Sequence, residues 1–591
     1  MEVAEHVSLH TAIPSVHGLP RTWRGGQRVA RTLLVVSTLV GCGSHQGSAA
    51  EENASKATGG ASNKAGVSAA AGVGGKSAGG STSIASTGDG VDGGVTSNTG
   101  ASVMAGAGAT SSGGSTSIAS AGDGFGGNDS SGGATQPTAP PTVSGITIEP
   151  NPNNNLSCYV SWTTDVAANS EVAFGADQPE FRILEEELVT QHRVLVIGMH
   201  ATTDYLIQAV STNADGSDSA EGQFTTGALP SGLPVATLTT EDTTASQQGW
   251  TLTNIMPAGS GGGFVGVAPG IIAMYDQQGI PVWYYVNGDT ADQRGDVSTR
   301  ILPNNDILLG PSSGEPAKEV DLAGNVVWQG PPQPGEGDTA APMSHYAGKL
   351  ENGNYVILRD NTSNGIQGAL IEELTADNEV AWSWNLFDHM QPDADAQTDW
   401  CHPNAVTVDL ANDVFYLSCR WLGIIKAERS GAQSVLWVLG GELDGGSFSF
   451  NPAESAFDDQ HDPEIHEDGT ILLYNNADNG VPRGGSYQTR VLEFSIDEQN
   501  MQANLEFEFP GEFDVDPWYT TSWATPYWGD ADRLANGNIL ITIGYRSQAQ
   551  ATHLVEVRPT DGRVVWEITM PLSVGSYQAE RWSPPPLVMP F

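Results

Sequence analysis

Short runs that alternate apolar and polar residues recur along the chain from residue 231 to residue 591. Each unit is an apolar strand, a polar turn and a second strand that ends in Trp, and this alternation is typical of β-hairpins. Clear copies occupy 273–285, 319–330, 371–384, 424–440 and 554–568, and a copy at 491–509 lacks the Trp. A second hairpin signal, such as "LENGNYVIL", precedes every copy except the first, where the segment "PAGSGGGFVG" stands in its place. Two hairpins per unit make a four-stranded blade, so the pattern predicts an all-β, six-bladed β-propeller over 231–591.

Residues 140–228 show a different series of short alternating strands separated by turn signals. This pattern predicts a β-sandwich that precedes the propeller. The segment resembles a fibronectin type III domain, in which Trp162 would be the core Trp and Tyr205 the corner Tyr. We find no candidate chemistry in it and expect a spacer or a carbohydrate-facing module.

Residues 43–139 consist of Gly, Ser, Ala and Thr with hardly an aromatic residue, and "GGSTSIAS" occurs twice. Such a composition buries too little apolar surface to offset the entropy lost on folding. We therefore expect a disordered tether.

Residues 1–42 have the pattern of an export signal. Four arginines precede the apolar run "TLLVVSTLVG", which is too short to span a membrane and ends at Cys42. "LVGC" resembles a bacterial lipobox, in which the Cys is lipidated after cleavage. This resemblance implies an exported lipoprotein in the periplasm or at the cell surface, anchored to a membrane through Cys42. The alternative is an ordinary cleaved signal in which Cys42 has no role.

Charge and cysteine content narrow the classes of partner. The chain has 24 Lys and Arg against 69 Asp and Glu, which disfavours binding to nucleic acid and to anionic membrane surfaces. Cys158 has no evident partner, whereas Cys401 and Cys419 lie near opposite ends of one predicted hairpin. This pair could form a disulfide in an oxidising compartment, or it could remain as two buried thiols.

Three histidines begin the predicted innermost strands of consecutive blades. His345 and His461 each lie seven residues before the turn of their blade, whereas His402 lies ten residues before its turn. Arg420 ends the strand that returns beside His402. Because inner strands surround the propeller axis, we expect these four side chains to converge there.

Such a cluster has three interpretations. Arg and imidazole groups can form a cradle for oxyanions, and one imidazole can attack an electrophilic sulfur or phosphorus centre. Three imidazoles could instead bind a metal ion. The histidines could also be unrelated residues at the ends of strands.

The motifs around these residues are more specific than the residues alone. They are "SHYAGKLENGNYVIL", "DWCHPNAVTVD" followed by "SCR", "QHDPEIHEDGTILLYNN", "GDADRLANGNILI" and "SYQAERW". In these motifs the segment 231–591 resembles the bacterial arylsulfotransferase family, whose fold is a six-bladed propeller. The resemblance implies that His461 is the nucleophile that becomes sulfated and that His402 and Arg420 bind the sulfate. His345 matches the remaining site histidine, which many members hold in a His-His pair; here its neighbour is Ser344.

The resemblance implies a ping-pong transfer of a sulfuryl group from an aryl sulfate donor to a phenolic acceptor, without a cofactor. No P-loop motif is present, which agrees with a donor that is not a nucleotide. Aromatic residues near the site motifs could stack on the substrate ring or pack in the core; they are Trp400, Trp421, Trp523, Tyr527 and Trp528. Two other classes compete: a non-catalytic surface scaffold, which would not need the His-Arg set, and a quinone-dependent dehydrogenase, which would need eight blades and a calcium site.

Overall fold

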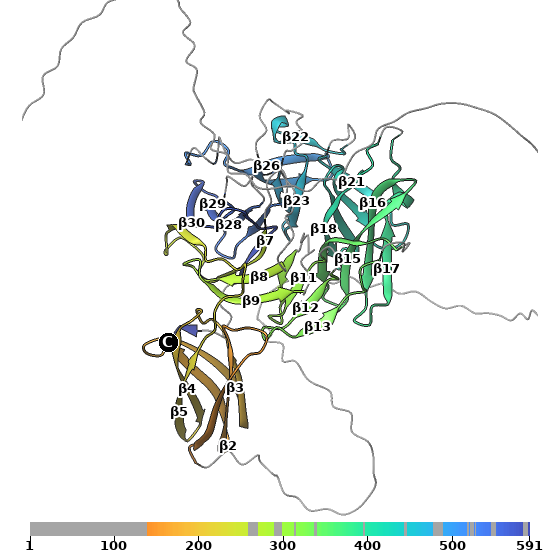
Figure 1. Ribbon diagram of the computed structural model, residues 1–591. Coiled ribbons are helices and arrows are strands. Elements are labelled where there is room, and N and C mark those ends of the chain that lie inside the picture. Colours follow the sequence, from red (N-terminus) through yellow and green to blue (C-terminus); the bar gives the residue numbers. More distant parts are fainter. Residues whose placement is uncertain are drawn as a thin grey trace, which may run out of the picture. The chain divides into compact units, whose positions relative to one another are not determined.

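The computed structural model describes part of the chain (Figure 1). The described residues are 139–590 without 258–269, 289–297, 312–314, 336–339, 394–395, 442–445, 477–488, 517–518, 520–524, 526–527, 545–550 and 583–588. The expected signal segment with Cys42, all but the last residue of the expected tether, and most of "PAGSGGGFVG" lie outside them. No helix within this part of the chain is long and apolar enough to cross a lipid bilayer.

The N-terminal part of the described chain is an antiparallel sandwich. Its strands are β1 (Val143–Pro150), β2 (Cys158–Gly175), β3 (Phe181–Val196), β4 (Asp204–Asn213) and β5 (Gly216–Thr225), and β33 (Met589–Pro590) pairs with β3. The first half of β2 pairs with β1 and with the end of β3. After an irregular stretch, its second half pairs with the start of β3 and with β4. β2 and β3 therefore pair along most of their length, and β1 and β4 occupy successive halves of the other edge of β2.

Two aromatic residues stand at the positions that the fibronectin resemblance implies. Trp162 is buried, stacks on His192 and donates from Nε1 to Ser211 Oγ at 2.8 Å. The Tyr205 hydroxyl accepts from the backbone N–H of His200 at 2.8 Å, which is the arrangement of a tyrosine corner. Membership of the fibronectin type III family stays a prediction.

Six further sheets follow within the described residues, and they confirm the predicted all-β propeller. Blades 2, 3 and 4 each consist of four consecutive antiparallel strands. Blade 2 contains β10 (Thr299–Ile301), β11 (Ile307–Leu309), β12 (Lys318–Val320) and β13 (Val326–Gln329). Blade 3 contains β14 (Met343–Lys349), β15 (Tyr355–Ser363), β16 (Ile366–Leu374) and β17 (Val380–Asn385), which α1 (Leu386–His389) follows. Blade 4 contains β18 (Pro403–Asp409), β19 (Val414–Cys419), β20 (Gly423–Glu428) and β21 (Val435–Leu439).

Blades 5, 6 and 1 each carry an additional strand. Blade 5 contains β23 (Gln460–Ile465), β24 (Thr470–Asn475), β25 (Arg490–Asp497), β26 (Gln502–Phe509) and the parallel β22 (Ser449–Asn451). Blade 6 contains β27 (Asp530–Arg533), β28 (Ile539–Ile543), β29 (His553–Arg558), β30 (Arg563–Thr569) and β6 (Thr237–Glu241). Blade 1 contains β31 (Val574–Gly575), β32 (Ala579–Trp582), β7 (Trp250–Pro257), β8 (Gly270–Tyr275) and β9 (Pro281–Asn287).

Blade 1 corrects one expectation from the sequence. Its innermost strands are not the first half of a local hairpin pair but β31 and β32, from the C-terminal end of the propeller. Conversely, β6 from the N-terminal end is the outermost strand of blade 6. Hydrogen bonds between segments more than 300 residues apart therefore close the ring at two places. Local periodicity could not indicate this pairing, because β32 is only four residues long.

The Trp of the repeat has an acidic partner across the blade in three blades, whereas Trp283 of blade 1 pairs with Met274 and Trp437 of blade 4 pairs with Lys426. The acidic partner is a Glu on the third strand, in register with the Trp, in blades 2, 3 and 6, and the degenerate copy in blade 5 pairs Glu493 with Phe507 instead. Each of these Glu residues forms an ion pair with a cation from the next blade; the pairs are Glu319–Lys349, Glu373–Arg429, Glu493–Arg533 and Glu556–Arg581. The repeat thus encodes contacts between blades as well as within them.

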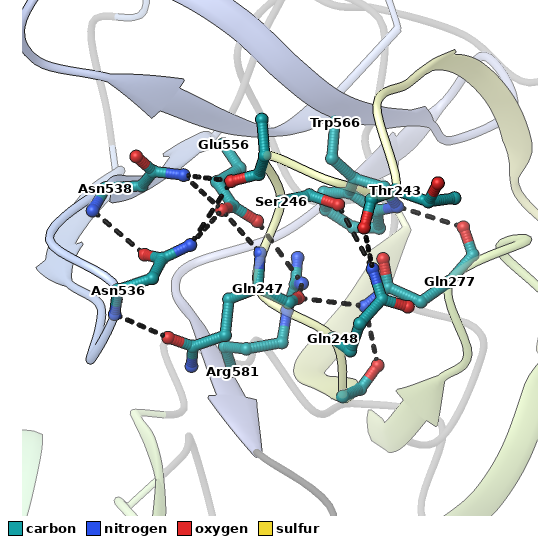
Figure 2. A network of polar contacts seen from close by, with 12 residues as sticks. Thr243, Ser246, Gln247, Gln248, Gln277, Asn536, Asn538, Glu556, Trp566 and Arg581 are labelled. Carbon is teal, nitrogen blue, oxygen red and sulfur yellow. Dashed lines mark hydrogen bonds and ion pairs between the residues drawn. The ribbon is translucent and has the colours of Figure 1, made fainter.

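The last of these pairs lies where the ring closes (Figure 2). Glu556 and Arg581 are both fully buried, with Oε2 and Nη1 3.4 Å apart. Glu556 Oε1 accepts from Asn538 at 2.7 Å and from the backbone N–H of Gln247 at 2.8 Å. Arg581 stacks on Trp566, with its guanidinium carbon 4.3 Å from the ring centre. The network connects blade 6 with β32 of blade 1 and with the segment between β6 and β7, and its buried charges are paired, as burial requires.

Candidate active site

The structure brings the three histidines of the sequence prediction together at one end of the inner strands. His345 is the third residue of β14, His402 directly precedes β18, and His461 is the second residue of β23. The ring centres of His345 and His402 lie 5.0 Å apart. Both His345 and His461 have their ring centres 6.1 Å from that of Tyr577, which precedes β32. Blades 1, 3, 4 and 5 therefore supply one site.

Irregular backbone at the start of each inner strand accompanies this convergence. His345 has φ 54° and His402 has φ 52°, in the left-handed region that non-glycine residues rarely occupy. The pairing register shifts near both residues, and it shifts again directly after His461. Such bulges redirect a side chain out of the alternation of a regular strand. The surrounding fold must hold these conformations, because each positive φ costs about 1–3 kcal/mol.

Asn476 determines which ring nitrogen of His461 carries the proton. The Asn476 amide nitrogen lies 2.7 Å from the carbonyl oxygens of both Thr525 and Trp528, and these can only accept. Its Oδ1 must therefore face His461, whose Nδ1 lies 2.7 Å away. Because an amide oxygen only accepts, Nδ1 carries the hydrogen and the lone pair of the neutral ring is on Nε2.

Arg420 is buried beside these rings and holds a fixed positive charge. Its Nε donates to Asp459 Oδ1 at 3.0 Å, and the Asp459 side chain is fully buried. The backbone N–H of Arg420 donates to the carbonyl oxygen of His402 at 3.1 Å. Cys401 and Cys419 form a disulfide in the structure, with Cα atoms 4.8 Å apart, so a covalent bond joins the residues that precede His402 and Arg420.

The other two histidines have different polar partners. His402 Nδ1 lies 2.7 Å from Asp399 Oδ2, and this carboxylate can balance a positive charge on the ring. Although burial alone would raise it, the hydrogen bond with His402 holds the pKa of Asp399 below its usual value. His345 Nδ1 lies 2.6 Å from the hydroxyl of Ser344, the residue that replaces the second histidine of the family pair.

Burial lowers the pKa of two of the site histidines, His345 and His461. It lowers the pKa of His345 to about 4, and the nearby His402 adds to the shift. Burial, followed by the charge of Arg420, lowers the pKa of His461 well below its usual value. Both rings are therefore neutral at neutral pH, and a neutral imidazole is the form that can act as a nucleophile.

The structure adds residues that the sequence did not reveal, and these are Asn476, Asp459, Asp399 and Tyr577. Asp399 and Asp459 lie within three residues of a predicted site histidine, which is a local signal. Asn476 directly follows β24, the strand that pairs with β23, but many loop asparagines resemble it in sequence. Among the aromatic candidates, Trp421 packs against the Arg420 guanidinium at 4.4 Å.

The remaining aromatic candidates have packing roles or are not described. Trp400 packs on Phe387, and Trp528 lies in a small buried cluster with Met256 and Tyr577. Trp523 and Tyr527 lie outside the described residues. Among the residues that the structure describes, no group of three or more His, Cys, Asp or Glu side chains has an arrangement that could hold a metal ion.

Comparisons with solved structures give distant similarities. A crystal structure of a protein of unknown function from Bacteroides caccae is 13% identical, with a TM-score of 0.36, over 55% of this chain and 94% of that chain. A quinonprotein alcohol dehydrogenase-like protein from Bacteroides thetaiotaomicron is 8% identical, with a TM-score of 0.30, over 72% of this chain and 94% of that chain. Similarities of this size do not bear on the function of this chain. No curated protein matches this chain.

A family model gives a clear assignment. The model described as Arylsulfotransferase (ASST) matches residues 247–578, more than half of the chain. The matched segment runs from the start of blade 1 to the residue before β32, and it includes all three histidines and Arg420. On this match the chain belongs to the arylsulfotransferase family, as the site motifs in its sequence predict.

Proposed function

We propose that this protein transfers a sulfuryl group from an aryl sulfate to a phenol through a sulfo-histidine at Nε2 of His461. The observation that carries the proposal is the contact with Asn476, which leaves the Nε2 lone pair of a neutral, buried imidazole for attack. The positive charge of Arg420 lies close enough to lower the pKa of this ring. A nucleophile beside a fixed cation suits an anionic electrophile such as a sulfate ester.

In the first half-reaction, Nε2 of His461 attacks the sulfur atom of the donor. The N–S bond forms, the S–O bond to the aryl oxygen breaks, and a phenolate leaves. Charge develops on the peripheral and leaving oxygens in such a loose transition state. Arg420 stabilises the peripheral oxygens, and a protonated His402, balanced by Asp399, donates its proton to the phenolate.

In the second half-reaction, the oxygen of an acceptor phenol attacks the same sulfur atom. The N–S bond breaks, the lone pair returns to Nε2, and neutral His402 takes the phenol proton. His345, with its low pKa, stays neutral throughout and contributes hydrogen bonding and shape. Each cycle restores both histidines, so the transfer needs no cofactor.

A chromogenic aryl sulfate, incubated with and without phenol, tests this proposal. We expect release of the coloured phenol to be much faster when an acceptor phenol is present, with parallel lines in double-reciprocal plots as a ping-pong mechanism requires. Activity should persist in a chelator. Activity lost with chelator and restored by zinc would instead support a metal site, and no turnover with any donor would favour the non-catalytic scaffold.

We further propose that the protein is exported and anchored through lipidated Cys42. The disulfide between Cys401 and Cys419 supports an oxidising compartment, since such bonds rarely persist in a reducing cytosol. Cys42→Ala should release the protein from the membrane fraction in soluble form. Unchanged fractionation of this variant would place the anchor elsewhere or show that there is none.

A further inference from the structure

A cluster of buried and half-buried ionic side chains adjoins the nucleophile along the inner strands, and the proposed mechanism does not use it. Blade 2 contributes Arg300 from β10, and three other blades contribute carboxyl groups. The carboxyl groups are Asp462 and Glu464 on β23, Asp530 and Asp532 on β27, and Glu580 on β32. Alternating positions on β23 and β27 thus face the same region. One guanidinium lies among five carboxyl groups.

The closest contacts of Arg300 are with the residue that follows the nucleophile. Its Nη2 lies 2.9 Å from Oδ1 and 3.2 Å from Oδ2 of Asp462. Glu580 is farther away, at 3.6 Å from Nη1. Gln578 also donates to Asp462 Oδ2, at 3.1 Å. Asp462, in blade 5, is therefore held by one residue of blade 2 and by one residue of the segment before β32 in blade 1.

The remaining carboxyl groups compete weakly for Arg300. Burial raises the pKa of Asp530 and of Asp532 well above the usual value, and neighbouring carboxyl groups add to both shifts. Burial raises the pKa of Glu580 to about 7. Some carboxyl groups of the cluster are thus protonated at neutral pH. The short contacts show that Asp462 is the main ion-pair partner of Arg300.

The backbone at Asp462 needs such support. Asp462 has φ 38°, and the pairing of β23 with β24 is interrupted between His461 and Glu464. Residues held in such conformations persist only where surrounding contacts enforce them. His461 directly precedes this bulge, so its direction depends on the same backbone.

We propose that Arg300 is a positioning residue for His461. Through its ion pair with Asp462, it holds the bulge that directs the imidazole toward the reacting sulfur atom. The inference rests on the proposed role of His461 as the nucleophile. A displacement of about 1 Å of a reacting group can cost about 100-fold in rate, so we expect an effect of that order on kcat.

The test compares Arg300→Gln with Arg533→Gln as the matched control. Arg533 is also on an inner strand, as the last residue of β27, and it pairs with the carboxylate of Glu493 at 2.6 Å. Its side chain is 28% exposed, against 29% for Arg300. We expect Arg300→Gln to lower kcat about 100-fold with little change in KM. Arg533→Gln should keep kcat even if its melting temperature falls equally. Arg300→Lys, which retains one donor for Asp462, should recover most of kcat.

A chemical probe makes the result independent of turnover. Diethyl pyrocarbonate acylates neutral imidazoles, and mass spectrometry can follow its reaction at His461. We expect this rate to change in Arg300→Gln and to match the wild type in Arg533→Gln. A folded Arg300→Gln variant with the wild-type kcat and the wild-type acylation rate would overturn the inference. A raised KM with unchanged kcat would also overturn it, because that result would mean that the charge of Arg300 acts on binding of the donor and not on the position of His461. Absence of sulfuryl transfer in the wild type overturns the proposed function instead, and the acylation rates still report on positioning.

Discussion

His461→Ala is expected to lose both donor cleavage and sulfuryl transfer completely, because no covalent intermediate can form without Nε2. Burst experiments with a chromogenic aryl sulfate measure the first loss, and formation of the sulfated acceptor measures the second. The wild type, stopped during turnover with donor alone, should carry one sulfuryl group on His461 in peptide mass spectra. Retained turnover in His461→Ala would show that another group is the nucleophile.

His466→Ala is a suitable control for this experiment. His466 directly follows β23, at the end opposite to His461, and its Nε2 lies 3.7 Å from Glu464 and 3.8 Å from Glu493. We expect this variant to keep the wild-type rate. Equal loss in both variants would indicate damage to β23 rather than removal of a nucleophile.

The pH dependence of donor cleavage also tests whether His461 is the nucleophile. The neutral ring is the nucleophile, and burial with the charge of Arg420 lowers the pKa of His461. The neutral fraction therefore stays high as pH falls through the ordinary histidine range near 6.5. We expect the rate of the first burst to persist below pH 6.5, and a decline centred on that value would argue against a buried nucleophile.

Arg420→Ala is expected to lower kcat about 100- to 1000-fold, which corresponds to about 2.7–4 kcal/mol of transition-state stabilisation for one donor to an oxyanion. The variant also leaves the fully buried Asp459 carboxylate without its cation. Removing one partner of a buried pair typically costs about 3–5 kcal/mol of folding stability. Loss of activity in this variant alone could thus reflect unfolding, so the melting temperature must be measured together with the steady-state rate.

Two further substitutions separate these effects. The double variant Arg420→Gln with Asp459→Asn removes both charges and should recover stability without recovering activity. Arg420→Lys keeps the charge but loses the planar fork, so it should keep part of kcat. A double variant with wild-type kcat would show that Arg420 serves only to pair Asp459.

Much of the fold could be predicted from local patterns in the sequence. The repeated strand–turn–strand unit with a final Trp predicted the blades, since hairpins are local and each alternates apolar and polar residues. The same repeat contains the Glu residues that pair in register with the Trp, at Glu319, Glu373 and Glu556. Their cation partners come from the next blade, at distances along the chain that no hairpin pattern reports.

The site could be predicted in part for the same reason. His345, His402 and His461 each occur beside a recognisable turn, and the motifs around them carry the resemblance to the family. Their offsets indicated that inner strands would bring them together. The offsets did not indicate the positive φ of His345 and His402, because bulges depend on pairing with the neighbouring strand.

What the sequence by itself determined is the class of fold, the repeat and the set of histidines with Arg420, because each depends on residues close together in the chain. The tertiary structure alone decided how the ring closes, since β32 pairs with β7 across more than 300 residues. It also decided the tautomer of His461, because Asn476 is oriented by two carbonyl groups about 50 residues further along. The contact between Arg300 of blade 2 and Asp462 of blade 5 likewise joins two blades that are distant in the sequence. Such contacts form only when the packed blades bring distant residues within hydrogen-bonding distance, and no local pattern records them.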